Sequence, residues 1–567
     1  MFAKRTSRLS FLVAVATVPL STAQAGGFTE RLGDVWKLAK KVVDVVGDYP
    51  TLRATVRTKR AQPCPIDTGF DPAAALTDAG KAALLAKAGA YEDALAARHF
   101  VQNIVVSRAE IHPDTKAVQL YPSSIGDASY HSGQLLAARA FRYGVTGKPT
   151  DLDLVQNSLI GVYNLLTIAS APSGKITNPR AGDGKMAAVP GLPVRAFVEE
   201  GNPLFAGATD LDVKNPDVYR YTGTLKGAPT SRRYLVKANV SRDQINGLLF
   251  GIAAAHEVLN PKKELVDVRR DVARAVTTFI RNYVKRGYRL FDLDSRLLME
   301  GPPADLIPTL SWLKTAAIVT NESDIKKAYD KLVKDYFGGS TIEKLFKQAI
   351  FKGLQDLVQS LVGDHIELLQ MVLRDFNYNL LVLPLYALLR FEKNAETRDV
   401  YKHYLKHTIK PLVGNLRIPF FDAVYLLGTG EKDNARVRRA AGVLRQFRNP
   451  PFPFGNPAPG ATTPVTDFST RKDLRDPLFD HLSEVWETHL KKDFPGENNP
   501  IRYGGGIWPL GPGLAPRDNN IERANPYRVT GEKASGSMTV DGKKTLLEYP
   551  GEDYLLNYWI ARYHKFL

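Results

Sequence analysis

Residues 240–259 of the chain read VSRDQINGLLFGIAAAHEVL. Apolar side chains recur at Ile245, Leu248 and Ile252, a spacing that predicts an amphipathic helix over 244–259. Gly247 and Gly251 interrupt this apolar face, and residues without side chains allow another backbone to approach closely. We therefore predict a helix that packs tightly against a neighbouring helix.

A second segment is organised in the same way. Residues 125–131 read IGDASYH and lead into LLAARAFRY at 135–143, again with a helical apolar pattern. Asp127 precedes this second helix, and Asp243 lies at the start of the first. Both segments therefore place an aspartate at the start of a long apolar helix.

The remaining chain repeats this alternation of helices and short connections. We predict antiparallel helix pairs at 131–145 with 152–169, 244–259 with 266–286, 304–319 with 323–337, and 377–390 with 396–409. Further helical patterns lie at 29–46, 73–100, 342–372, 422–427, 434–447 and 552–564. About a dozen such helices predict a mainly α protein, an (α/α)6 toroid of helical hairpins with long β and loop insertions.

The predicted toroid spans 126–567, and two long non-helical segments interrupt it, at 171–240 and 450–550. Residues 219–223 and 233–236 in the first of these insertions have β patterns. Loops of this length inside a domain commonly form lids or the walls of a binding cleft. Residues 26–125 are expected to form a helical and extended region that packs on the toroid.

The N-terminus has the pattern of a secretory signal peptide. Lys4, Arg5 and Arg8 precede an apolar stretch, and Ala23-Gln24-Ala25 forms a cleavage signal, which predicts a signal peptide over 1–25. No later stretch reaches the roughly 18 uninterrupted apolar residues of a membrane span. We therefore expect a periplasmic or secreted protein without a membrane span.

Composition and motifs further restrict the possible partners, cofactors and reaction classes. The net charge of +17 favours an acidic partner: an anionic polysaccharide, a nucleic acid or a membrane surface. No nucleic-acid-binding motif is present, so we expect no nucleic-acid partner. The sequence contains no phosphate-binding loop, dinucleotide-binding turn, HExxH motif or serine nucleophile elbow. The single cysteine, Cys64, and ten scattered histidines give no zinc spacing, so we expect neither a metal nor a cofactor.

Asp127 and Asp243 are the candidate catalytic residues. Glycoside hydrolysis requires a pair of carboxylates, one as acid and one as base or nucleophile. The competing interpretation is structural, because aspartate is a common N-cap.

Other residues are candidates for substrate binding, each against a structural alternative. Tyr130 and His131 follow Asp127 within one helical turn, and Arg242 lies beside Asp243. Arg195 lies in the first insertion, where an arginine can bind a hydroxyl or a carboxylate. The remaining two candidates are Asn377, near the start of a helix, and Tyr527, in the second insertion.

Several of these segments resemble one protein family. They are Gly126-Asp127 leading into 135–143, Ser241-Arg242-Asp243-Gln244 leading into 247–251, and the C-terminal pattern NPY at 525–527 followed by YPGEDYLL at 549–556. They are similar to bacterial exported six-hairpin (α/α)6 glycosidase-like proteins, some of which look like the glycoside hydrolase group that includes endo-D-arabinanases. The resemblance implies a toroid with acidic residues in its cleft, at Asp127 and Asp243 here. Ile125 replaces a tryptophan that the family pattern would place before Gly126.

We therefore expect an exported glycoside hydrolase that acts on a polysaccharide or oligosaccharide through two carboxylates. Two alternatives remain open. A polysaccharide lyase would use Tyr130 or His131 as base on an acidic glycan. A non-catalytic glycan-binding or envelope-assembly protein would use both aspartates only as caps.

Overall fold

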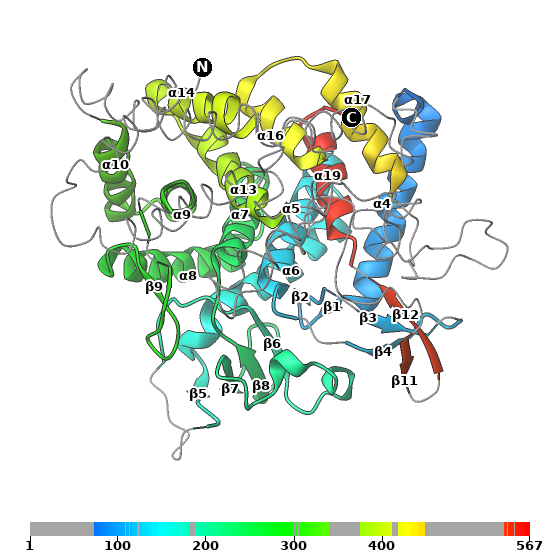
Figure 1. Cartoon of the computed structure of the whole chain (residues 1–567), viewed down its shortest axis with the longest axis vertical. Coiled ribbons are helices and arrows are strands. Elements are labelled where there is room, and N and C mark those ends of the chain that lie inside the picture. The colour runs from blue at the N-terminus through cyan, green and yellow to red at the C-terminus, as the bar shows by residue number, and fades with distance from the viewer. Residues whose placement is uncertain are drawn as a thin grey trace, which may run out of the picture.

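Helices account for most of the residues that the computed structural model describes (Figure 1). The structure describes residues 73–107, 109–112, 114–121, 125–180, 188–299, 301–302, 305–338, 375–410, 418–447, 538–540, 543–548 and 550–567. The predicted signal peptide, the helix at 342–372, Tyr527 and most of the insertion at 450–550 lie outside these residues. Within them the protein is mainly α, as predicted, with 12 α-helices.

The helices fall into two kinds that alternate along the chain. Helices of the first kind are buried on nearly all sides: α5 (Ala128–Thr146), α7 (Arg242–Leu259), α9 (Leu306–Thr320), α13 (Asp375–Phe391), α16 (Pro419–Thr429) and α19 (Glu552–Tyr563). Helices of the second kind have one exposed face: α4 (Asp78–Arg98), α6 (Pro149–Thr167), α8 (Val266–Lys285), α10 (Ser323–Phe337), α14 (Ala395–Tyr404) and α17 (Asn434–Gln446). Three of the four helix pairs predicted from sequence pack together: α5–α6, α9–α10 and α13–α14. The fourth prediction was wrong as a packed pair, because α8 packs on α6 and α9 and hardly touches α7; α16 and α17 also pack together.

Glycines let α5 and α7 touch backbone to backbone. A Cβ atom added to Gly133 of α5 would lie 2.0 Å from the carbonyl oxygen of Gly247 in α7. One added to Gly251 would lie 2.2 Å from the carbonyl oxygen of Gly133. Such distances are far below van der Waals contact, so only glycine fits at this crossing. The predicted close approach at Gly247 and Gly251 is confirmed.

The first insertion folds into a four-stranded antiparallel sheet, shown in green and cyan in Figure 1. Its order is β5 (Gly174–Thr177), β7 (Val218–Gly223), β8 (Arg232–Lys237), β6 (Ala196–Glu199). The predicted β segments at 219–223 and 233–236 are β7 and β8. Beside the sheet, the Arg195 amide donates to the Lys237 carbonyl (2.9 Å), and the Arg195 carbonyl accepts from the amide of Ser129 in α5 (2.9 Å). These bonds fix the edge of the sheet against the first turn of α5.

A second sheet joins the two ends of the described chain. Its order is β11 (Met538–Val540), β12 (Lys543–Glu548), β3 (Ala109–Ile111), β4 (Val118–Leu120), all antiparallel. Figure 1 shows red β12 beside blue β3, and α19 packs against both α4 and α5. The smaller hairpins are β1 (Phe100–Val101) with β2 (Ile104–Val105), and β9 (Leu290–Phe291) with β10 (Leu297–Met299).

Among the described residues, no helix combines the length and the apolar character that crossing a bilayer requires.

Candidate functional site

The candidate site lies where the N-terminal ends of α5 and α7 meet. Asp127 occupies the N-cap position of α5 but makes no capping hydrogen bond with its side chain. At α7 the capping is done by Ser241 and Gln244, which form a capping box, while Asp243 lies in the first turn. Neither aspartate therefore serves its helix as the capping side chain.

Gln244 and Ser241 connect the two aspartates. The amide nitrogen of Gln244 donates to Asp127 Oδ1 (3.0 Å) and to the Gly126 carbonyl (3.1 Å). The amide oxygen of Gln244 accepts from the Ser241 backbone (2.7 Å) and faces the Ser241 hydroxyl (2.8 Å). The same hydroxyl is hydrogen-bonded to Asp243 Oδ1. The structure thus brings both predicted catalytic residues into one polar cluster.

The two carboxyl groups have different surroundings. The Asp127 side chain is 43% exposed, and its Oδ1 lies 3.7 Å from the Arg195 guanidinium. Asp243 is half-buried. Burial raises the pKa of Asp243, as does the nearby charge of Asp127; the Ser241 contact and the Arg195 charge oppose this without cancelling it. One carboxyl group is therefore open and beside a cation, and the other is half-buried with a raised pKa.

Arg195 reaches the cluster from the edge of the insertion sheet. Its side chain is 24% exposed, but its Nε is buried and has no hydrogen-bond partner. An arginine carries five donors in a planar group, so much of its bonding capacity is unused here. The structure thus places Arg195 beside Asp127, in the same cluster as the two aspartates.

Tyr130 and His131 lie beneath the aspartates rather than beside open solvent. Tyr130 is 3% exposed, and burial together with the carboxylates of Asp243, Glu552 and Asp127 raises its pKa well above 10. His131 is also buried, with its Nδ1 2.6 Å from Glu552 Oε1. Their side chains support the site from inside the protein.

Glu552 is a residue of this cluster that sequence reasoning did not select. It opens α19 directly after Gly551, which has a positive φ of 73°. An acidic residue at a helix start resembles the pattern at Asp127, and that similarity was the available signal. Because Glu552 is far from His131 in the sequence, their contact could not be predicted.

Arg242 extends the cluster to a third helix end. Its guanidinium donates to Asp305 Oδ1 (2.6 Å), at the N-cap position of α9, where Asp305 makes no capping bond with its side chain. The Arg242 side chain is 49% exposed, whereas Asp305 is 5% exposed. The helix ends of α5, α7 and α9 therefore all carry an aspartate. Of the other predicted ligands, Asn377 lies in the first turns of α13, and Tyr527 lies outside the described residues.

Lys237 and Asp210 form a polar wall beside Gly126. The Lys237 ammonium donates to the Asp210 carbonyl (3.2 Å), and a Cβ at Gly126 would lie 3.6 Å from Asp210 Oδ2 and 3.8 Å from Lys237 Cε. Burial is the main cause that lowers the pKa of Lys237 and raises that of Asp210. Sequence reasoning did not select either residue, because single charged residues in an insertion have no distinctive pattern.

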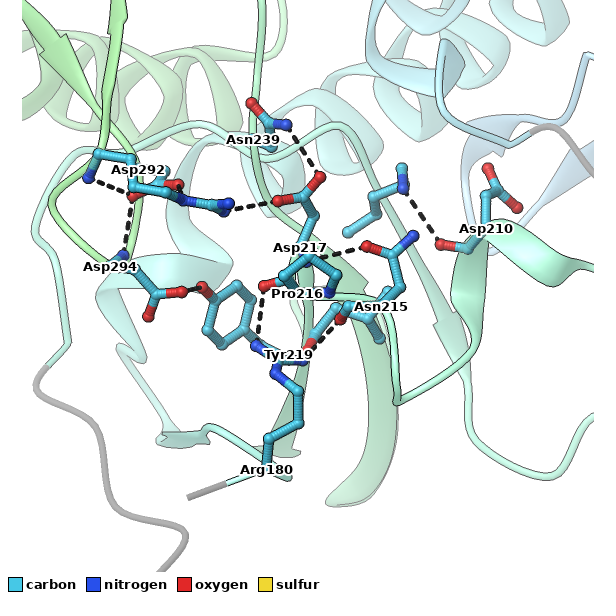
Figure 2. A network of polar contacts seen from close by, with 12 residues as sticks. Arg180, Asp210, Asn215, Pro216, Asp217, Tyr219, Asn239, Asp292 and Asp294 are labelled. Carbon is cyan, nitrogen blue, oxygen red and sulfur yellow. Dashed lines mark hydrogen bonds and ion pairs between the residues drawn. The ribbon is translucent and has the colours of Figure 1, made fainter. Parts of the chain in front are cut away.

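A hydrogen-bond network holds this wall in place (Figure 2). Asp217 accepts from Asn239 (2.9 Å) and from Arg296 (2.6 Å), and Arg296 also donates to Asp292 (2.6 Å). Burial of Asp217 opposes its ionisation, but the bonds from Asn239 and Arg296 outweigh burial and lower its pKa. The insertion is thereby fastened to the loop between β9 and β10.

Arg180 organises the other side of the same network (Figure 2). Its guanidinium donates to the carbonyl groups of Asn215 (2.6 Å), Pro216 (2.7 Å) and Val218 (2.7 Å). It also lies 5.3 Å from the ring centre of Tyr219, whose hydroxyl donates to Asp294 (2.5 Å). The loop before β7 is therefore held by one arginine side chain.

Two adjoining cavities lie elsewhere, between α6, α8 and the insertion. Their volumes are about 340 and 240 Å³, and Tyr163, Thr167 and Pro172 line both. Charged groups that line them are already paired with each other, since the Lys226 ammonium lies 2.6 Å from the Asp271 carboxylate. We place the candidate site at the helix ends instead, because Gln244 and Ser241 there join two carboxyl groups with different environments.

Comparison with known proteins gives no match. No protein-family model, curated protein or solved structure is similar to the chain. Within the described part of the chain, no group of three or more His, Cys, Asp or Glu side chains is arranged to hold a metal ion.

Proposed function

We propose that this protein is an exported glycoside hydrolase that cleaves a polysaccharide through Asp127 and Asp243. The observation that carries the proposal is the joining of these two carboxyl groups through Gln244 and Ser241 at adjacent helix ends. A pair of carboxyl groups in different environments, one of them with a pKa raised by burial, is the equipment for acid–base cleavage of a glycosidic bond. One would protonate the leaving oxygen, and the other would activate water or attack the sugar.

We further propose that the helices form the (α/α)6 toroid that the sequence predicts. Successive buried helices pack pairwise: α5 on α7, α7 on α9, α9 on α13, α13 on α16, α16 on α19, and α19 on α5. This cyclic order of contacts supports a closed ring, with the site at the helix ends. The signal pattern at 1–25 and the charge of +17 support export and an acidic glycan.

The cap-only alternative is weaker than the hydrolase. It requires both aspartates to serve their helices, yet Asp127 makes no capping bond and Ser241 caps α7. The lyase is also weaker, because a lyase base must be accessible and readily deprotonated. Tyr130 and His131 are both buried, and burial raises the pKa of Tyr130.

The test is a panel of glycans incubated with the wild type, Asp127→Asn and Asp243→Asn, with products identified by mass. Each substitution is expected to reduce cleavage by at least about 100-fold, because each removes a group that transfers a proton or forms a bond in the reaction. Asp267→Asn is the matched control, since that aspartate is 85% exposed on α8 and should leave cleavage unchanged. Full activity in either site variant overturns the assignment, and unsaturated products absorbing in the near ultraviolet would indicate a lyase.

A further inference from the structure

Two arginine side chains at the helix ends have hydrogen-bond donors that the protein itself does not use. The Arg195 guanidinium lies 3.7 Å from Asp127 and makes no hydrogen bond with any residue that the structure describes. Arg242 donates from Nη1 to Asp305 (2.6 Å), which is the partner of its side chain among the described residues. The two side chains are 24% and 49% exposed, so a ligand can reach both.

The arginines of the neighbouring insertion sheet are bonded more fully. Arg220 donates to both carboxylate oxygens of Glu200 (2.6 and 2.9 Å), and Arg232 donates to both oxygens of Glu199 (2.8 and 2.7 Å). A guanidinium holds its donors in a planar fork, which a carboxylate can occupy with both of its oxygens. Within the described residues, neither Arg195 nor Arg242 has its fork occupied in this way.

Both of these arginines are nevertheless held in place. The Asp305 side chain is 5% exposed and makes no capping bond at α9, and it holds one end of the Arg242 guanidinium. The backbone of Arg195 is fixed by its bonds to Lys237 and to Ser129 at the start of α5. Groups that are already oriented lose less conformational freedom when a ligand binds.

The two arginines lie on either side of the candidate carboxyl groups along the row of helix ends. Arg195 lies beside Asp127 at the end of α5, and Arg242 extends from the end of α7 to Asp305 at the end of α9. Asp127 and Asp243 lie between them, joined through Gln244 and Ser241. A glycan that crosses these successive helix ends therefore meets a cation on each side of the two aspartates.

We propose that the site binds an anionic glycan, and that Arg195 and Arg242 each bind an acidic group, a carboxylate or a sulfate, on sugars to either side of the bond that is cleaved. Without cations beside them, the aspartates would repel such a glycan. A neutral glycan would cover the two guanidinium groups without supplying an anionic partner, which costs binding energy. The bond that is cleaved rests on the proposed function, whereas the binding of acidic groups does not depend on cleavage.

The experiment is isothermal titration calorimetry with three matched pairs of glycans, using Asp243→Asn as the background so that the glycan stays intact. Two pairs are polygalacturonate and alginate, each compared with a form whose carboxyl groups are reduced to alcohols; the third is dextran sulfate compared with dextran. Salt at about 0.15 M limits the general attraction of a basic protein. In at least one pair, the acidic member should bind about tenfold or more tightly than the neutral member. The first two pairs report on carboxylate and the third on sulfate.

The variants assign this preference to the two arginines. Arg195→Gln and Arg242→Gln should each reduce it about tenfold, because each removes a charge-assisted pair. Arg232→Gln is the matched control, since it removes the same charge from an exposed side chain of the insertion sheet and should leave the preference intact. Arg195→Lys and Arg242→Lys keep the charge without the planar fork and should retain part of the preference, which provides the test if a glutamine variant does not fold.

Two results would overturn the proposal. One is equal binding of the acidic and neutral members in all three pairs. The other is a preference that both glutamine variants retain, which would assign it to the net charge of the chain and leave Arg195 only to balance Asp127.

The proposed function and this inference can fail separately. If the preference depends on both arginines but no glycan is cleaved by the wild type, the hydrolase falls and the anion site stands. If a neutral glycan is cleaved through both aspartates and no acidic glycan is preferred, the anion site falls and the hydrolase stands.

Discussion

Arg195 illustrates how one side chain sets the balance between two carboxyl groups. It lies 3.7 Å from Asp127, and its charge lowers the pKa of Asp243 without overcoming burial. The residue belongs to the insertion, whereas both aspartates belong to helices. The insertion therefore influences the pKa of a carboxyl group at the helix ends.

Replacing Arg195 by glutamine should raise the pKa of Asp243 further, because a nearby positive charge that favours the ionised form is lost. If Asp243 is the carboxyl group that protonates the leaving oxygen, a higher pKa keeps it protonated to higher pH, so the alkaline limb of the activity profile should move to higher pH. The pH dependence of kcat/KM measures this. Arg232→Gln is the control, since Arg232 is an exposed residue of the same sheet paired with Glu199. An unchanged or lowered alkaline limb would contradict the prediction.

The residues that could be predicted share a local signal. Asp127 and Asp243 lie at helix starts, and helix starts can be located from apolar periodicity. Asp210 and Lys237 could not be selected, because they meet the site only through contacts between distant parts of the chain. Glu552 has the same local signal as Asp127, a place at a helix start, but no local pattern shows that α19 lies beside α5.

Among the elements, the pair α5 and α7 holds the two aspartates in place. Gly133, Gly247 and Gly251 bring the two backbones into contact just inside the helix ends. Because the contact is between backbones, it fixes the spacing of the two helix ends that carry the aspartates.

Gly133→Ala should destabilise the protein by at least about 1–3 kcal/mol, since its methyl group would overlap the backbone of Gly247. Urea denaturation of the variant and the wild type measures the loss. Gly89→Ala is the matched control in α4, where no atom lies within 4 Å of the added carbon. That variant should be neutral or more stable by up to about 1 kcal/mol. Equal stability of Gly133→Ala and the wild type would refute a tight crossing.

The positions of helices and strands were predicted better than the contacts between them. Apolar periodicity located α5 to α10, and β patterns located β7 and β8. Sheet order depends on contacts that no local pattern encodes, so the pairing of β12 with β3 could not be predicted.

At the scale of the whole molecule, the pairing of β3 with β12 fastens the early part of the described chain to its end. Glu548 of β12 is 1% exposed in its side chain and accepts from Arg98 (2.8 Å) and His99 (3.3 Å). Burial of Glu548 opposes ionisation, but the bonds from His99 and Arg98 prevail and lower its pKa.

Glu548→Gln should therefore destabilise the protein at neutral pH, by about 3 kcal/mol if it behaves like other broken buried pairs. A carboxyl with a lowered pKa contributes its full stability above its unfolded value, near 4.3, and loses it as pH falls through the folded value. The difference between variant and wild type should thus shrink in acid. Urea denaturation across pH measures this.

Glu322→Gln serves as the comparison, because that glutamate forms an exposed pair with Arg281. Its loss should cost at most about 1 kcal/mol. A constant effect of Glu548→Gln at every pH would show that the ionised form of Glu548 does not provide this stability.

The sheet that unites β3 with β12 also sets an order of events during synthesis. β3 leaves the ribosome long before β12 is made, so during synthesis its edge lacks this partner strand. Folding of the segments made first therefore cannot complete this sheet while the chain is still growing towards β12. The exposed strand edge has to remain free of other partners during that interval.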